Sequence, residues 1–406
     1  MIVTKSNAFD FHKETLFVKK VFVCALLFLT ILLTFGELYP RKSQKIDLST
    51  GAGISKMLRY DDAQVYLFGE THRCTEYQQF RNALFKYLVE KKGVRVLVEE
   101  SGYATAFLEN ETVQGRLSFS DWLDRCTLSK EDYELYSWIA DWNSGKDAAE
   151  KISIIGIDIT DDVGNIQTLC QYLLKNHDFT GADTQTQGLL TAIREQNPFS
   201  SLQLQTFQEK FLPQLAELYQ TKPKQLETVL GTQTVYLERA LLGWEEAQEQ
   251  RRLKGETEQL GGPDGSYREN CLYEHFMWEY QQRPDAKYYG QFGGAHVLMS
   301  DYSGKLYRVQ NSFVTRLAEI GSPLNGKLTV IDGCLTFEIG DLGGTGTNRA
   351  TLYRTARARP PVRDRNKFYT DGSAPDAGYA QYVLLFEHPD ALTAAKEYTG
   401  SYWKYH

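Results

Sequence analysis

The amino-acid sequence predicts an α/β fold with a mainly parallel central sheet, helices on both faces and a helical insertion. Short apolar runs alternate with longer segments of helical periodicity from about residue 60 onward, a pattern typical of repeated strand–helix–strand units. The runs carry few polar residues, as expected for strands that helices cover on both faces. The predicted strands are Gln64–Phe68, Val94–Val98, Ile152–Ile157, Lys287–Phe292, Lys327–Ile331 and Tyr379–Phe386.

Two connections between these strands carry further information about the fold. Glu76–Lys91 places Phe80, Leu84 and Leu88 at helical spacing, so a helix is expected to join the first two strands into a parallel unit. Residues from about 167 to 260 are rich in Gln, Glu, Leu and Lys with the same periodicity and lead into a turn-rich stretch, which predicts a helical insertion. The insertion is expected to cap one end of the sheet or to pack as a helical layer, and we prefer the cap.

The N-terminus carries a signal for export. Lys19 and Lys20 precede Val21–Phe35, an uncharged run rich in Leu, Val and Phe, which is typical of a signal peptide and shorter than the ~20 residues that span a bilayer. A cleaved signal and an uncleaved membrane anchor both stay open. We therefore expect an export signal or anchor at 1–38, a linker at 39–60, an α/β domain at 61–406, and an extracytoplasmic protein that is secreted, periplasmic or membrane-anchored.

Composition narrows the class of partner. The chain is 42% hydrophobic and 24% charged, as in ordinary globular proteins, and its formal net charge is -7. Because such a charge gives no general attraction to nucleic acid, we expect a small-molecule substrate and no nucleic-acid partner. Contact with a membrane is expected only through the N-terminal segment, if it is uncleaved. The six cysteines include no C-x-x-C pair, which argues against a structural zinc site.

Acidic and imidazole side chains follow the ends of four predicted strands. In chain order they are Glu70 with His72, Glu99 with Glu100, Asp158, and His296. Because the carboxyl ends of parallel strands share one edge of a sheet, where ligands bind in open α/β folds, these residues are expected to meet in one site. Gly69 precedes the first histidine closely and Gly293-Gly294 the second, so the backbone there is able to turn sharply or approach a ligand.

Arg268 opens a predicted helix, Tyr267–Tyr280, directly before the fourth strand. Its guanidinium would reach the same edge and there bind a carboxylate or stabilise an oxyanion. A surface ion pair with Glu269 is an equally weighted alternative. Asn270 is a further candidate to contact a substrate.

The motifs resemble those of the erythromycin esterase-like superfamily, whose wider relatives include haem-binding lipoproteins and metal-dependent proteases with a glycine-to-histidine motif. The resemblance covers most of the chain after about residue 60 and implies a hydrolase of cyclic esters or related bonds, with His72 as general base. Arg73 stands where the family usually has a glycine, so a macrolide is not implied as the substrate. The motifs are Gly69–His72, the strand-ending acid of Glu99–Ser101, Gly156–Asp158, the Arg268 helix and Gly294–His296.

The preferred mechanism is general-base hydrolysis without a covalent intermediate or a required cofactor. His72 takes a proton from water, Glu70 or Glu99 holds its imidazole, and Arg268 with His296 stabilises the oxyanion. No serine lies in a Gly-x-Ser-x-Gly motif that would favour a nucleophilic mechanism. Of the two adjacent glutamates we select Glu99 as catalytic. The predicted substrate-binding residues are Glu100, Asp158 and Asn270.

Two alternatives use the same positions differently. In the first, His72, His296, Glu70 and Glu99 bind a divalent metal such as zinc, manganese or iron, which activates a water molecule. In the second, the chain is a non-catalytic binding protein for haem or another aromatic ligand, with His72 or His296 as an axial ligand.

Overall fold

The computed structural model describes residues 42–70, 72, 75–123, 126–159, 162–197, 200–257, 266–303, 308–309, 311–335, 349–355, 378–386 and 394–399. The predicted export segment, Val21–Phe35, lies outside these residues, as do Thr71, Arg73 and Cys74 beside His72. Among the described residues, no helix combines the length and the apolar character needed to cross a membrane.

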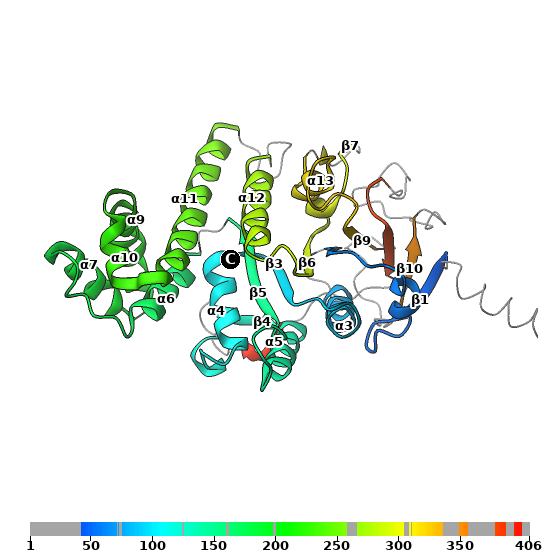
Figure 1. Ribbon diagram of the computed structural model, residues 1–406, viewed down its shortest axis with the longest axis horizontal. Coiled ribbons are helices and arrows are strands. Elements are labelled where there is room, and N and C mark those ends of the chain that lie inside the picture. Colours follow the sequence, from blue (N-terminus) through cyan, green and yellow to red (C-terminus); the bar gives the residue numbers. More distant parts are fainter. Residues whose placement is uncertain are drawn as a thin grey trace, which may run out of the picture. The chain divides into compact units, whose positions relative to one another are not determined.

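The fold is built around a central sheet of eight strands (Figure 1). Every neighbouring pair from β11 to β5 is parallel, whereas β10 is antiparallel to both β11 and β1. All six predicted strands belong to this sheet, which confirms the α/β fold. In spatial order the strands are β1 (Ser43–Asp47), β10 (Arg349–Arg354), β11 (Tyr382–Phe386), β9 (Leu328–Leu335), β2 (Val65–Glu70), β6 (Tyr288–Gly293), β3 (Val96–Gly102) and β5 (Ser153–Asp158).

Helices cover the sheet on both faces (Figure 1). Tyr66 and Phe68 of β2 pack on one face with α3 (Thr75–Lys92), where the rings of Phe68 and Phe80 lie 5.0 Å apart between centroids. Val65 and Leu67 of the same strand pack on the other face with α12 (Ser266–Gln282) and α13 (Phe313–Ala318). Because alternate side chains of a strand point to opposite faces, covering both faces explains the uninterrupted apolar run.

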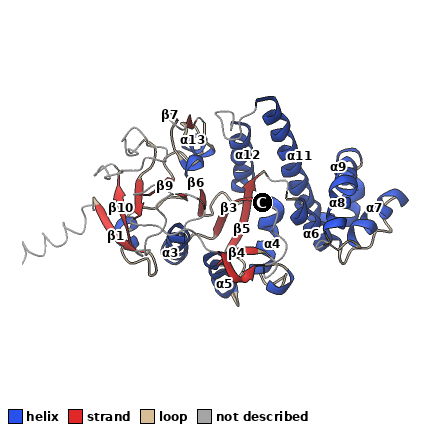
Figure 2. Cartoon of the chain, turned by 180° about the vertical axis from the view of Figure 1, so that it is seen from behind, coloured by secondary structure: helices blue, strands red, loops and turns tan. Residues whose placement is uncertain are grey.

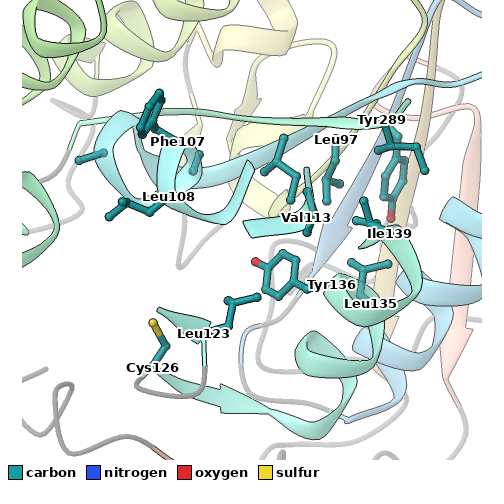
Figure 3. Close-up of a cluster of buried hydrophobic side chains, with 14 of the residues drawn as sticks. Leu97, Phe107, Leu108, Val113, Leu123, Cys126, Leu135, Tyr136, Ile139 and Tyr289 are labelled. Atoms are coloured by element: carbon teal, nitrogen blue, oxygen red, sulfur yellow. The ribbon is translucent and has the colours of Figure 1, made fainter. Parts of the chain in front are cut away.

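The first face also holds α4 (Tyr103–Val113) and α5 (Lys130–Asn143). Figure 3 shows part of their shared core, where Leu97 of β3 and Tyr289 of β6 lie near Val113 of α4 and Ile139 of α5. Ser129 caps α5 through a reciprocal pair of hydrogen bonds with Asp132. This cap fixes the start of the helix that carries Tyr136. Short strands lie outside the main sheet: β4 (Thr127–Ser129) with β12 (Ala394–Thr399), and β7 (Tyr302–Ser303) with β8 (Arg308–Val309).

The range predicted as a linker, 39–60, contains a strand and a short helix. β1 lies in this range and pairs with β10 at the sheet edge, and α2 (Ile54–Leu58) follows it. Only one side chain of β1, that of Ile46, is buried. A mostly exposed edge strand therefore looks like a polar linker in the sequence, because its hydrogen bonds go to a strand about three hundred residues away.

Between β5 and β6 the chain forms the helices α6 (Val163–Leu174), α7 (Thr184–Arg194), α8 (Ser201–Thr206), α9 (Leu212–Thr221), α10 (Pro223–Leu230) and α11 (Thr234–Thr257), with a π-helical turn at Phe207–Phe211. They span the range where the insertion was predicted. Figures 1 and 2 show α6 to α10 beside the β5 end of the sheet. Phe107 of α4 anchors them, its ring 4.9 Å from Tyr236 and 5.8 Å from Tyr172 between centroids. The insertion is thus a helical layer, and the preferred expectation of a cap was wrong.

Gly333 of β9 provides a test of how tightly the sheet packs against α3. A methyl group there would collide with the buried ring of Tyr77 and lie 2.7 Å from the carbonyl oxygen of Gly69 in the next strand. We expect Gly333→Ala to lower the free energy of unfolding by ~1–3 kcal/mol, because neither the buried Tyr77 ring nor the Gly69 backbone can move aside without an energetic cost. Urea unfolding measures this change.

Gly188 in α7 is the matched control, since no atom lies within 4 Å of the added methyl group. Gly188→Ala should leave stability unchanged or raise it by up to ~1 kcal/mol through helix propensity. Equal unfolding midpoints for the two variants would contradict the packing described for β9.

Candidate functional site

A cavity of about 350 Å³ lies at the carboxyl ends of β2, β3, β5 and β6. Its volume is at the lower end of the ~300–1,000 Å³ range of ligand pockets in proteins. Six of the predicted site residues line it: Glu70, His72, Glu99, Glu100, Asp158 and Arg268. None of the described residues of the helical insertion lines it. The position of the cavity follows from the sheet, since parallel strands present their carboxyl ends at the same edge.

His72 stands at the mouth of the cavity, with a side chain that is 62% exposed. Its Nδ1 lies 2.8 Å from Oε1 of Glu70, which fixes the tautomer that carries a proton on Nδ1. Glu70 is nearly buried and also accepts hydrogen bonds from the side-chain amides of Gln78, at 3.3 Å, and Gln291. The hydrogen bond to Glu70 raises the pKa of His72, and the charge of Glu100 adds to the effect.

Arg268 is the centre of a second group of charges. Its Nε and Nη2 donate to the two carboxylate oxygens of Asp158 at 2.8 and 2.5 Å, a forked geometry that only a guanidinium provides. Nη2 also donates to Oε1 of Glu100 at 2.8 Å. Burial alone would lower the pKa of Arg268, but Asp158 and Glu100 raise it above its ordinary value. Asp158 and Glu100 come from β5 and β3, so this one side chain connects α12 to two strands.

His296 follows β6 in a short 3-10 helix and is 12% exposed. Its Nδ1 hydrogen bonds to Glu269, and its Nε2 lies 3.3 Å from Oε1 of Glu100 and 3.1 Å from Nη1 of Arg268. Burial would lower the pKa of His296, but Glu269 and Glu100 raise it to about 10. At neutral pH His296 is therefore an imidazolium that donates from both nitrogens.

Gly293 lies close to both His72 and Glu100, and so links His72 to the charged group around Arg268. Its amide donates to Oε2 of Glu100 at 2.6 Å. A Cβ placed on Gly293 would lie 3.1 Å from Nε2 of His72, which is a tight contact, and 3.6 Å from Oε2 of Glu100, which is an ordinary one. The sequence pointed to this glycine as a place of close approach, and here the approach is between the backbone and the histidine itself. His296 and Arg268 hold Glu100 and keep its pKa well below its usual range, against the effect of burial.

The choice of Glu99 over Glu100 does not match the geometry. Glu100 contacts Arg268, whereas Glu99 accepts a hydrogen bond from the hydroxyl of Tyr136 at 2.9 Å and lies beside Glu109. Adjacent residues of a strand point to opposite faces, so the two glutamates could not both face Arg268. Burial raises the pKa of Glu99 above its ordinary value.

Asn270 does not line the cavity. Its Oδ1 accepts a hydrogen bond from Arg316 of α13 on the protein surface. Two residues after Arg268, Asn270 lies about 200° farther around a helix with 3.6 residues per turn, which turns it away from the sheet edge.

Several residues of the site carried no clear signal in the sequence. Glu269 was considered only as a partner of Arg268, yet it binds His296 and also accepts a hydrogen bond from the amide of Phe313 at 2.8 Å. Gln291 lies inside a predicted strand, two residues after the buried Tyr289. Because residues two apart point to the same face of a strand, this spacing is the signal that the sequence offers. Others come from helices that reach the edge only through tertiary packing: Gln78, Arg81, Glu109 and Tyr136.

The four predicted metal ligands take part in three separate contacts. Glu70 pairs with His72, Glu99 with Tyr136, and His296 with Glu269. Within the described residues, no group of three or more His, Cys, Asp or Glu side chains has the arrangement that could hold a metal ion. The metal-dependent alternative gains no support from this geometry.

Solved structures share the fold. A mutant of the erythromycin esterase EreC in its open conformation superposes with a TM-score of 0.58 at 14% identity, covering 87% of this chain and 98% of that one. The chain has an erythromycin esterase-like fold. A Bacillus cereus protein gives a TM-score of 0.57 at 15% identity, with 87% and 97% covered. A succinoglycan biosynthesis protein gives 0.55 at 14% identity, with 86% and 95% covered. The sequence matches no protein-family model and no curated protein.

The raised pKa of His296 predicts a pH dependence of stability. A base whose pKa rises from 6.5 to about 10 on folding stabilises the protein fully below pH 6.5 and loses this contribution as the pH rises through about 10. We expect the difference in unfolding free energy between the wild type and His296→Gln to fall over this range, by about 1.4 kcal/mol for each pH unit.

Urea unfolding at a series of pH values measures this difference. His177→Gln is the control, because the imidazole of His177 hydrogen bonds to the neutral side chain of Gln233. A constant difference for His296→Gln from pH 6.5 to 10 would show that His296 is not held as a cation by Glu269 and Glu100.

Proposed function

We propose that the chain is a hydrolase in which His72 activates water to cleave an ester or a related bond of a small molecule. The observation that carries this proposal is the placement of His72, held by Glu70, across one cavity from Arg268 and its carboxylate partners. One side of such a cavity accepts a proton and the other side stabilises negative charge, which are the two requirements of general-base hydrolysis.

The first step is proton transfer to His72. Glu70 holds the proton on Nδ1, so the lone pair is on Nε2, which takes a proton from water as the water attacks the substrate carbonyl. Glu70 then stabilises the imidazolium that forms. The raised pKa of His72 suits this role, because a general base is most effective when its pKa lies near the working pH.

Stabilisation of the oxyanion falls to Arg268. Asp158 and Glu100 occupy its Nε and Nη2. Nη1, which contacts Nε2 of His296, carries two protons, and one of them would be donated to a tetrahedral oxyanion. The imidazolium of His296 lies 3.1 Å from Nη1 and adds positive charge at this place. The protonated His72 returns its proton to the leaving oxygen. With Glu100 and Asp158 holding Arg268, these carboxylates position the cation instead of binding the substrate.

The likeness of fold to erythromycin esterase supports hydrolysis as the reaction class. The N-terminal run Val21–Phe35 supports an extracytoplasmic location for this activity. No cofactor is needed in the proposed mechanism.

His72→Ala should lower kcat on any ester that the purified protein hydrolyses by about 10²–10⁴-fold, because the general base is lost. Its fold stability should change little, since the side chain is 62% exposed. Initial rates on a panel of aryl and alkyl esters measure the effect. His177→Ala, a substitution in the helical insertion, should keep wild-type rates. Full activity in His72→Ala would refute this mechanism.

Glu70→Gln should move the pH–rate profile. Hydrolysis requires neutral His72, so the rate of the wild type should rise with pH through a pKa above 6.5. Removing the charge of Glu70 lowers the pKa of His72, so the acid limb should shift to lower pH while the plateau rate falls. Glu90→Gln, at an exposed position of the same helix that carries Gln78, is the control. If the acid limb does not move, the pKa that it reports belongs to a group other than His72.

A further inference from the structure

The inner wall of the cavity carries polar atoms that the proposed reaction does not use. We use the name inner wall for five residues that line the cavity behind Glu70 and Glu100: Gln78, Arg81, Ser101, Glu109 and Gln291. Each has one buried side-chain atom without a hydrogen-bond partner in the described part of the chain. These atoms are Oε1 of Gln78, Nη2 of Arg81, Oγ of Ser101, Oε2 of Glu109 and Oε1 of Gln291.

Leaving so many polar atoms unpaired in one place is costly. A buried donor or acceptor without a partner costs about 1–3 kcal/mol, and buried polar groups in proteins are satisfied with few exceptions. Glu109 is 6% exposed, Gln78 8% and Arg81 9%. All five residues line the same cavity, so one group bound there could satisfy these atoms once the side chains turn toward it.

The chemistry of these atoms restricts what that group is. Arg81 offers a donor, the two glutamine oxygens are acceptors, and the hydroxyl of Ser101 is either. A cation would satisfy the acceptors and be repelled by Arg81, and an anion would do the reverse. A hydroxyl group donates and accepts at once, so several neighbouring hydroxyls match the mixture.

The Glu99–Glu109 pair fits the same conclusion. The single hydroxyl proton of Tyr136 cannot be donated fully to both carboxyls, which lie 2.9 and 3.1 Å from its oxygen. Burial, followed by the charge and hydrogen bond of Glu99, raises the pKa of Glu109 well above its ordinary value. The pair therefore holds one proton that the two carboxyls share, so together they carry one negative charge instead of two.

Apolar side chains complete the lining. Leu97, Leu128 and Leu135 face the same cavity and give a surface on which the C–H bonds of a ring are able to pack. We propose that the inner wall binds a cyclic polyol, such as a sugar ring, that forms part of the substrate whose ester bond reaches His72. Only the statement that the ring belongs to an ester substrate rests on the proposed function. The binding of the ring by the inner wall does not depend on it.

Binding is tested on the full-length protein by saturation-transfer NMR. The probes are myo-inositol and methyl glucoside, with cyclohexanol as a ring that lacks neighbouring hydroxyls and cyclohexylamine as a cation. We expect saturable binding of at least one polyol at millimolar concentration, and none of cyclohexanol or cyclohexylamine. Binding of cyclohexanol as tight as that of the polyols, binding of the amine alone, or no binding of any polyol would overturn the proposal.

Two variants locate the binding. Ser101→Ala removes one unpartnered hydroxyl and should weaken polyol binding about two- to tenfold, as expected for one hydrogen bond. Glu109→Leu removes a buried carboxyl and should weaken it about tenfold or more, with unfolding stability equal to the wild type or higher, because an unpaired polar atom is lost. Glu111→Leu is the control on the same helix, since Glu111 pairs with Arg116 outside this cavity. Unchanged affinity in both test variants would mean that the inner wall holds only water.

Kinetics separate this inference from the proposed function. Acetylated methyl glucoside and acetylated cyclohexanol are compared as substrates, and the polyol ester should have the higher kcat/KM in the wild type but not in Glu109→Leu. Polyol binding without hydrolysis of any ester would refute the hydrolase and retain the binding site. Ester hydrolysis without polyol preference or polyol binding would refute the binding site and retain the hydrolase.

Discussion

The fork between Arg268 and Asp158 is the interaction on which the site depends. It joins the first turn of α12 to the carboxyl end of β5, and the same guanidinium holds Glu100 at the end of β3. A partly buried cation between two carboxylates is stable only while both partners are present, since breaking a buried pair costs ~3–5 kcal/mol. The pairs thus fix α12 and two strand ends relative to one another. Glu100 extends this arrangement to the Gly293 amide in β6 and to His296.

The order of the strands makes this convergence possible. β6 lies between β2 and β3 although it follows both in the chain by well over a hundred residues. Its placement brings Gly293 beside His72 on one side and Glu100 on the other. A strand inserted between two earlier strands therefore converts two separate strand ends into one cavity. The described helices of the insertion that precedes β6 pack on α4 beside β5 (Figure 2).

The cavity divides into two parts with different electrostatics. At its mouth, His72 and Arg268 lie beside the carboxyl groups of Glu70, Glu100 and Asp158. Along the inner wall, burial and the neighbouring Glu99 raise the pKa of Glu109, which favours its neutral form, and Arg81 is the only cation among the five residues. Such a division suits a substrate that is held by its neutral hydroxylated part and cleaved at its other end. The unpaired atoms of the inner wall lower the stability of the fold, a cost that is common where function and stability compete.

The sequence by itself determined the α/β class, the six main strands, the helices α3 and α12, and the carboxylates and histidines at the strand ends. These features rest on local periodicity and on the rule that parallel strands share a carboxyl edge, so neighbouring residues contain the information. Only the tertiary structure gave Glu99 and Glu100 different partners, placed Asn270 on the surface, paired Glu269 with His296, and added β1 to the sheet. Each of these depends on which face a side chain takes or on which distant segment lies beside it. Such relations are set by packing between parts of the chain far apart in sequence, and no local pattern records them.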